Sequence, residues 1–360
     1  MCITVERMFH PLKRTYFLIT LLFAATLLIA YHSYWNPSYS LNMTLPHYGF
    51  TSSTQQRAVQ DLFKKAGIIG IDQSWEEVFP IRDNALALAQ DLLQMVQVTQ
   101  QKFTLRQHGQ ERWEVKPLDW MKKNKTTILQ DLRTLGFVEE VSLQTNKADA
   151  LCILGATRPR MTERVAYAET LIQQGFQTNR IILLTGERYV TQKVDGAVKT
   201  LSQIATRLRI QNWHQLTETH LLQDIYTHST LQSKNFTLDT LDVPANNASR
   251  PTTQSTLLAL IQWLQAHPEI HHIVFVSNQP YLKYQGAIID TLFSAHKINI
   301  SYEVVGPAVA SVNKLQPLLE GFGSYLWAAT PAVLSTLQID PTTPELKATF
   351  DALYPSSLNH

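Results

Sequence analysis

The sequence contains very little cysteine and has no excess of charge of either sign. Its 360 residues include two cysteines, and 31 basic side chains nearly balance 29 acidic ones, for a formal net charge of +2. Cys2 and Cys152 lie far apart, so an intramolecular disulfide is not expected. The even spread of charge argues against a nucleic-acid partner. With 44% hydrophobic residues, the chain is expected to fold around an apolar core.

Several motifs that identify enzyme classes are also absent. The sequence has no G-x-S-x-G elbow, H-E-x-x-H helix, C-x-x-C pair, P-loop or G-x-G-x-x-G fingerprint, and no Asp-x-Asp of metal-dependent glycosyltransferases. His267, His271 and His272 cluster before an apolar run, but no cysteine or carboxylate partner stands at ligand spacing. We therefore expect no metal site, and the cofactor remains unknown from the sequence.

An uncharged segment near the N-terminus is long enough to cross a bilayer. Residues 15–35 include the run TYFLITLLFAATLLIAY and carry aromatic residues at both ends, which predicts a transmembrane signal anchor. Arg7, Lys13 and Arg14 precede the run and no basic residue follows it closely. This bias predicts a single-pass inner (plasma) membrane protein with residues 1–14 in the cytoplasm and a periplasmic or otherwise extracytoplasmic domain. A cleaved signal peptide is the alternative.

The next region, residues 36–146, is predicted to be a tether followed by a helical subdomain. Asn84–Gln101 can form a long helix, and Thr127–Gly136 carries a Thr-x-x-Gln capping box and a C-terminal glycine. We find no catalytic constellation there and interpret it as a packing or spacer subdomain. Residues 331–360 are assigned to a C-terminal tail.

From residue 147 to residue 330, short apolar runs alternate with helical segments. The runs Ala150–Leu154, Ile181–Thr185 and Ile273–Ser277 are continuously hydrophobic, as expected for parallel strands buried on both faces. Residues 229–252 are read as a polar loop between two helices. The pattern predicts an α/β domain with a doubly wound, mainly parallel sheet of the Rossmann-like kind, with the three strands adjacent.

Polar side chains gather where the predicted strands end or the predicted helices begin. In an open parallel sheet these positions meet at the carboxyl edge, where ligands bind. We therefore predict a cleft, with Pro280 opening the helix beside it. Its expected lining residues are Gly155, Arg164, Thr185, Gly186, Glu187, Arg188, Glu218, Arg250, Thr252, Thr253, Ser277, Asn278, Gln279 and Tyr281.

These stretches resemble, in order, the motifs of the YdcF/SanA/ElyC-like family of envelope-associated Rossmann-like proteins, a domain of unknown function. The resemblance covers roughly Asp149 to Gly306. Each motif is short, and five in the same order make the match moderately specific. The matching positions are Gly155 and Arg164, Thr185 and Gly186, Thr217 and Glu218, and Thr253.

The sequence departs from the family pattern at several of these positions. Glu187 replaces the second glycine of a Ser-Gly-Gly turn, and Tyr281 and Tyr284 stand where the family usually has a histidine and an arginine. A long segment also separates Gly186 from Glu218. These departures leave the fold credible and place a shared substrate in question.

Three arginines of the predicted cleft suit an anionic small molecule. Arg164, Arg188 and Arg250 offer forked donors for phosphate or carboxylate, and nearby helix N-termini add backbone N–H groups. Glu218 is the candidate catalytic acid or base, and no nucleophile is identified. In the competing interpretation, Glu218 pairs with an arginine and only locks the loops.

The resemblance and the cleft together predict a membrane-anchored, exported domain that binds a phosphorylated or nucleotide-like small molecule in envelope-glycan or lipid-carrier metabolism. Whether the domain also processes this molecule stays open. The alternative is a non-catalytic envelope regulator or assembly factor, acting through protein partners on its helical subdomain.

Overall fold

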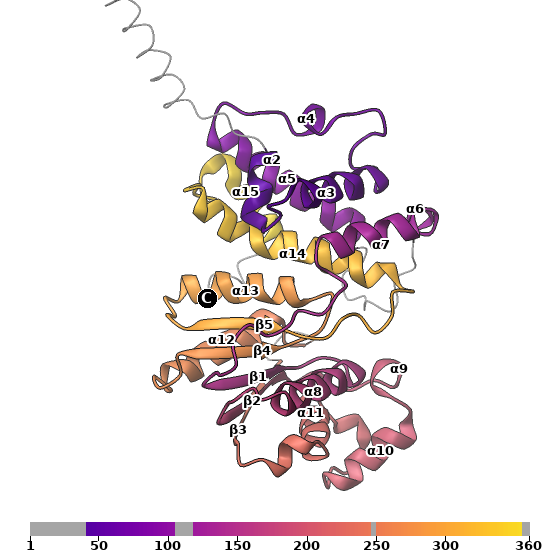
Figure 1. The fold of residues 1–360 in the computed structure, drawn as a ribbon, viewed down its shortest axis with the longest axis vertical. Helices are drawn as coiled ribbons and strands as arrows, with labels where there is room; N and C mark the ends of the chain where they lie inside the picture. The colour runs from indigo at the N-terminus through magenta and orange to yellow at the C-terminus, as the bar shows by residue number, and fades with distance from the viewer. Residues whose placement is uncertain (1–40, 105–117, 246–249, 355–360) are drawn as a thin grey trace, which may run out of the picture.

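The computed structural model describes residues 41–104, 118–245 and 250–354, and its centre is a five-stranded sheet (Figure 1). All neighbouring strands are parallel, in the order β3-β2-β1-β4-β5. The strands are β1 (Ala150–Leu154), β2 (Arg180–Gly186), β3 (Thr237–Val243), β4 (His272–Val276) and β5 (Ser301–Val305). This topology confirms the predicted Rossmann-like α/β fold and the adjacency of the three apolar strands.

Two sets of helices cover the two faces of the sheet. α8 (Arg158–Gln173), α10 (Val198–Arg207) and α11 (Glu218–Thr227) pack on one face, with Leu151 and Ile153 of β1. Alternate residues of β1, including Cys152, face the other side, where α12 (Thr253–Gln265) and α13 (Leu282–Ala295) lie. Burial on both faces explains why the central strands are continuously apolar.

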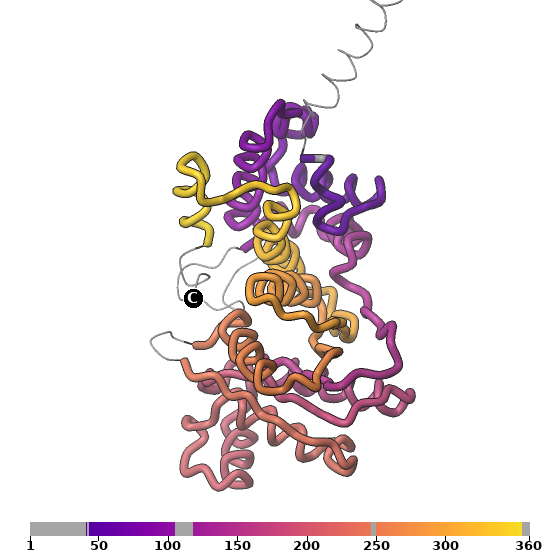
Figure 2. The backbone as a smooth tube through the Cα atoms, turned by 90° about the vertical axis from the view of Figure 1, so that its left-hand side faces the viewer, coloured from indigo at the N-terminus to yellow at the C-terminus, as the bar shows by residue number. Residues whose placement is uncertain are grey.

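A further layer of helices lies beyond α13. α14 (Leu315–Thr336) packs between α13 and α5 (Ala85–Phe103), and the remaining helices of this layer surround it (Figures 1 and 2). The ring of Phe322 on α14 lies 5.7 Å from that of Phe103 and 5.6 Å from that of Phe137. One apolar core therefore joins the helical layer to the sheet. The other elements are α2 (Leu41–Thr44), η1 (Leu45–Tyr48), α3 (Ser53–Lys65), α4 (Trp75–Val78), α6 (Asp119–Lys123), α7 (Lys125–Thr134), α9 (Gln192–Asp195), η3 (Trp213–Gln215), η4 (Thr230–Ser233) and α15 (Pro344–Leu353).

The fifth strand, β3, was missed by the sequence analysis. It lies within residues 229–252, which were predicted to be a polar loop. β3 pairs with β2 alone at the edge of the sheet, and most of its residues are exposed or half-buried. An edge strand need not be continuously hydrophobic, so it lacked the signal that identified the central strands.

Several helix boundaries differ from the expected ones. α7 begins at Lys125 after Asn124, without the predicted capping box. α13 begins at Leu282, two residues after the proline expected to open it, and Tyr281 is its N-cap. α14 runs on to Thr336 and α15 follows, so the region assigned to a tail from residue 331 is largely helical and packed.

The predicted anchor over residues 15–35 lies outside the described residues, as do residues 36–40 of the predicted tether. The rest of the predicted tether is packed on the protein, because Leu41, Leu45 and Tyr48 of α2 and η1 are fully buried in the core. Within the described part, none of the helices combines the length and apolarity needed to cross a bilayer.

Candidate functional site

A cavity of about 800 Å³ lies at the carboxyl edge of the sheet. Its walls come from the segments after β1 and β2 and from the beginnings of α8, α11, α12 and α13. α6, α7 and the beginning of α14 close it from the side of the helical layer. The chain order reverses between β1 and β4, which is the switch point where ligands of doubly wound sheets bind.

The cavity lining is strongly basic. Among the described residues that line it, Glu218 is the one carboxylate, against seven basic side chains. These are Lys122, Lys125, Arg160, Arg164, Arg188, Arg250 and Lys314. Low-dielectric walls lined by one sign of charge concentrate ions of the opposite sign, so the cavity favours an anion.

Arg188 joins two carboxylates at one side of the cavity. Its Nε donates to Glu218 Oε2 at 3.0 Å, and its Nη1 and Nη2 donate to the two oxygens of Asp195 at 2.9 and 3.0 Å. Asp195 also accepts backbone hydrogen bonds from Arg158 and Thr191. The competing prediction, that Glu218 pairs with an arginine, is therefore confirmed for Arg188.

The two carboxylates that share Arg188 have pKa values shifted in opposite directions. Burial would raise the pKa of Asp195, but the hydrogen bonds from Arg188 and from two backbone N–H groups outweigh burial and lower it. For Glu218, burial is the largest effect and raises the pKa, and Arg188 offsets it only in part. Asp195 already neutralises much of the Arg188 charge, so Glu218 gains less from the same guanidinium.

Arg164 is 2% exposed, and its hydrogen-bond partners among the described residues are uncharged. Its Nη1 donates to the carbonyl oxygens of Leu154 and Gly155 at 2.7 Å, and its Nε and Nη2 donate to Asn278 Oδ1. Burial, and next the charge of Arg160, lower the pKa of Arg164 to about 9. An anion in the cavity would stabilise the charged form of this arginine.

Two glycines allow close approach around the cavity. A Cβ on Gly155 would lie 2.0 Å from Glu218 Oε1, so the carboxylate packs directly over the glycine backbone. A Cβ on Gly186 would lie 2.5 Å from Cβ of Pro251. At both positions the groups that approach the glycine backbone belong to the protein itself.

Nine of the fourteen predicted site residues line the cavity, and they come from both halves of the sheet. They are Gly155, Arg164, Gly186, Arg188, Glu218, Arg250, Thr252, Thr253 and Tyr281.

The other five predicted residues do not line this cavity, and Thr185, Ser277, Asn278 and Gln279 are buried behind it. Thr185 is buried and bonds Thr219, while Glu187 lines a separate cavity of about 400 Å³. Asn278 orients Arg164, and Gln279 donates to the carbonyl oxygens of Gly136 and Glu139, which follow α7. Ser277 is fully buried. Residues 277–279 are thus mainly scaffolding, which corrects the prediction that they form a wall.

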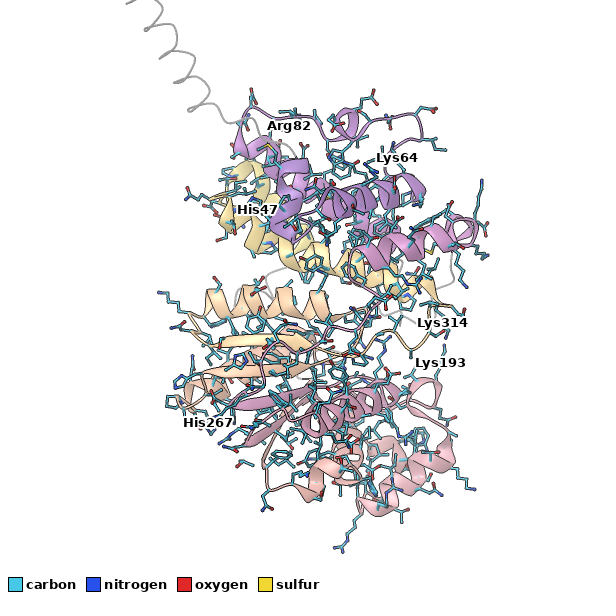
Figure 3. The ribbon with its side chains drawn as sticks, in the orientation of Figure 1. His47, Lys64, Arg82, Lys193, His267 and Lys314 are labelled. Carbon is cyan, nitrogen blue, oxygen red and sulfur yellow. The ribbon has the colours of Figure 1, made fainter. Side chains whose placement is uncertain are left out.

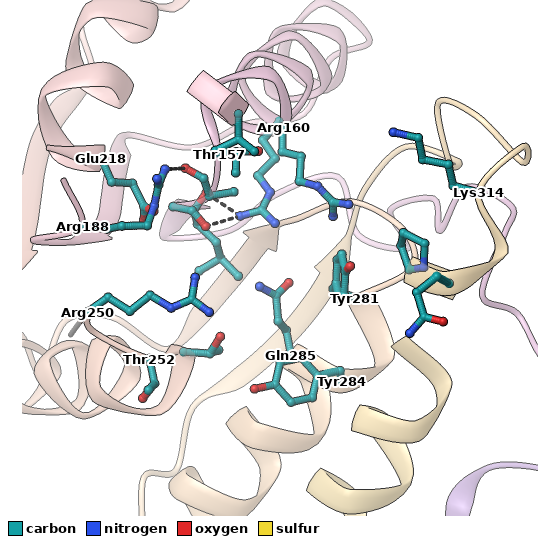
Figure 4. Close-up of a pocket in the computed structure, with 18 of the residues that line it drawn as sticks. Thr157, Arg160, Arg188, Glu218, Arg250, Thr252, Tyr281, Tyr284, Gln285 and Lys314 are labelled. Atoms are coloured by element: carbon teal, nitrogen blue, oxygen red, sulfur yellow. Dashed lines mark hydrogen bonds and ion pairs between the residues drawn. The ribbon is translucent and has the colours of Figure 1, made fainter. Parts of the chain in front are cut away.

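Several lining residues were missed by the sequence analysis. Arg160 was not among the predicted lining residues, but its guanidinium lies 4.6 Å from the centre of the Tyr281 ring and points with it toward the cavity (Figure 4). Lys122 and Lys125 belong to the region interpreted as a packing or spacer subdomain, and Lys314 is the N-cap of α14. Arg160 lies one turn before Arg164 on the same helix face. This spacing could have placed Arg160 in the cleft beside Arg164.

The histidine cluster has no role in the cavity. His267 lies on the opposite side of the molecule from Lys314 and Lys193 (Figure 3). His267 pairs with Glu269, and His272 Nδ1 lies 2.7 Å from Ser301 Oγ. The described residues contain no group of three or more side chains suited to a metal ion.

Comparison with known proteins gives no assignment for this site. No protein-family model matches the chain, and no curated protein matches it.

Proposed function

We propose that the cavity binds a phosphorylated or nucleotide-like small molecule. The observation that carries the proposal is the lining of seven basic side chains around Glu218 at the switch point of the sheet. Arg160 and Lys125 make no hydrogen bond or ion pair with other described residues, so their charges are available to a ligand. The N-termini of α8 and α12 add positive dipole ends at the same place.

Glu218 is the group that could take part in a proton transfer to such a ligand. Burial raises its pKa, which brings its ionisation closer to neutral pH, as required of a general acid or base. Its hydrogen bond to Arg188 fixes one oxygen, Oε2, while Oε1 lies over Gly155. In its fuller form, the proposal is that the protein binds this ligand and that Glu218 then acts on it as a general acid or base.

The resemblance to the YdcF/SanA/ElyC-like family supports a place in the cell envelope. In this proposal the segment at residues 15–35 anchors the chain in the inner membrane, and the domain works outside the cytoplasm on an envelope-glycan or lipid-carrier intermediate. A reporter active only outside the cytoplasm, fused after His360, should be active. Activity of a cytoplasm-specific reporter at the same position would refute this placement.

A search for copurifying ligands tests the binding proposal. Mass spectrometry of the purified full-length chain should detect a phosphate-bearing molecule that is depleted in Arg160→Gln. The matched control is Arg57→Gln, because Arg57 is an exposed arginine on α3 outside the cavity. Equal recovery of the ligand from both variants would place it elsewhere and overturn the proposal.

A further inference from the structure

Two buried glutamine side chains line the cavity and have amide oxygens without a partner. Gln285 on α13 is 6% exposed, and Gln316 in the first turn of α14 is 5% exposed. The Oε1 atom of each accepts no hydrogen bond from any described residue. Leaving a buried acceptor unsatisfied costs about 1–3 kcal/mol, so both oxygens call for a donor from a bound molecule.

The orientation of the Gln316 amide is fixed by the hydrogen bond that its nitrogen atom donates. Gln316 Nε2 donates to the backbone oxygen of Phe103 at 3.0 Å. Turning the amide around would place two oxygens against each other, so Oε1 must be the atom left without a partner. Gln285 follows Tyr284, and both point into the same space as Tyr281 and Arg160 (Figure 4).

The cavity is larger than a phosphate group requires. Its volume of about 800 Å³ lies in the upper part of the range of roughly 300–1,000 Å³ that is usual for small-molecule sites. A phosphate held by the arginines would leave the space beside Gln285 and Gln316 for the rest of the ligand. That part must donate hydrogen bonds to amide oxygens and can pack its carbon skeleton against the ring of Tyr284.

We propose that Gln285 and Gln316 form a second subsite, which takes the hydroxyl groups of a sugar whose phosphate lies against the arginines. Hydroxyl groups donate and accept, so one polyhydroxylated ring can satisfy both amides. A purely apolar substituent would leave both oxygens buried and unpaired, and the site selects against it. This inference rests on the proposed function and names the substrate class as a sugar phosphate.

A pair of ligands with and without hydroxyl groups tests the subsite. Calorimetric titration of the full-length chain should show that α-D-glucose 1-phosphate binds at least about tenfold more tightly than cyclohexyl phosphate, which carries the same phosphate on a ring without hydroxyls. Gln285→Leu should remove most of this preference and leave the affinity for inorganic phosphate unchanged. Because Gln285 Oε1 has no partner among the described residues, the variant should keep or raise the melting temperature.

The outcomes separate this inference from the proposed function. If inorganic phosphate binds and cyclohexyl phosphate binds as tightly as the glucose ester, the sugar subsite is refuted while the anion site stands. If AMP binds more tightly than the glucose ester and keeps its advantage in Gln285→Leu, the second subsite takes a base and the inference is overturned. If none of these anions binds, the proposed function itself fails.

Discussion

At the scale of single residues, some arginines of the site are held by other groups of the protein, and others can bind a ligand. Arg188 is held by Glu218 and Asp195, and Arg164 is held by Asn278 and two backbone carbonyl groups. Arg160 stacks on Tyr281 and keeps its N–H groups for a ligand. The locked arginines fix the shape of the cavity, so the ligand need not order them on binding.

Substitution of Gly155 by alanine tests how tightly Glu218 is placed. The new Cβ would lie 2.0 Å from Glu218 Oε1 and 3.1 Å from Cα of Thr185, so the carboxylate must leave its position. We expect a loss of about 1–3 kcal/mol in the free energy of unfolding, together with loss of ligand binding. Gly286→Ala is the control, since the nearest atom would lie 3.8 Å away within α13 and alanine favours a helix. Equal stabilities of the two variants in urea unfolding would contradict this packing.

The raised pKa of Glu218 predicts a distinctive pH dependence. The folded protein holds this proton more tightly than the unfolded chain, so the contribution of Glu218 to stability is fully present below its unfolded pKa of about 4.5 and is lost as the pH rises through the folded value. Urea unfolding across this pH range should show that the free energy of unfolding of the wild type falls relative to that of Glu218→Gln as the pH increases. A shift in favour of the wild type would mean that Arg188 lowers the pKa of Glu218 below its ordinary value.

At the scale of secondary-structure elements, helix N-termini bring polar groups to one edge of the sheet. α8, α11 and α12 all begin there, and the N-cap residue of each has an extended (β) backbone conformation. At α12, Thr252 Oγ1 accepts from Ser255 N at 3.2 Å, and Ser255 Oγ accepts from Thr252 N at 2.8 Å. This reciprocal capping positions a residue of the cavity lining.

Removal of the Thr252 hydroxyl should therefore weaken α12. Thr252→Ala is expected to lower the free energy of unfolding by about 1 kcal/mol, and Thr252→Ser should restore most of it. Thr343 provides the control, because it is the N-cap of α15 and its side chain makes no capping hydrogen bond. If Thr343→Ala has a lower melting temperature than Thr252→Ala, the capping role of Thr252 is refuted.

How far the sequence predicts these elements depends on where each lies. β1, β2 and β4 are central and continuously apolar, so their identity and direction follow from composition, whereas β3 at the edge carries no such signal. Arg188 follows β2 and Glu218 opens α11, and both positions meet at the carboxyl edge of an open parallel sheet, which is why the sequence identifies them. Lys125 and Gln316 reach the cavity only through the packing of the helical layer, which local patterns do not encode.

At the scale of the whole molecule, the helical layer and the sheet form one apolar core. Phe322 of α14 contacts Phe103 and Phe137, and the same core reaches Cys152 in β1. The region interpreted as a packing or spacer subdomain thus packs against the sheet domain and completes the cavity. Because the core is shared, we expect the regions on the two sides of residue 147 to unfold together.

Thiol labelling can test this cooperativity. Cys152 is fully buried, and burial raises the pKa of its thiol, so it should react only when the sheet opens. In a Cys2→Ser background, Phe322→Ala should cost about 3–5 kcal/mol and speed labelling of Cys152 by roughly two to four orders of magnitude. Ile71→Ala, at a residue that is 86% exposed, should leave the rate unchanged. Unchanged labelling in Phe322→Ala would show that the layers open separately.

Phosphate binding is the most direct test of an anion site in the cavity. Calorimetric titration of the full-length chain with inorganic phosphate should show binding that weakens at least about tenfold in the double variant Arg160→Gln/Lys125→Gln, which removes two charges from the cavity lining. The double variant Arg57→Gln/Lys64→Gln removes two charges from α3 instead and should bind as wild type does. Equal weakening in both double variants, or no binding by wild type at millimolar phosphate, would contradict the anion site.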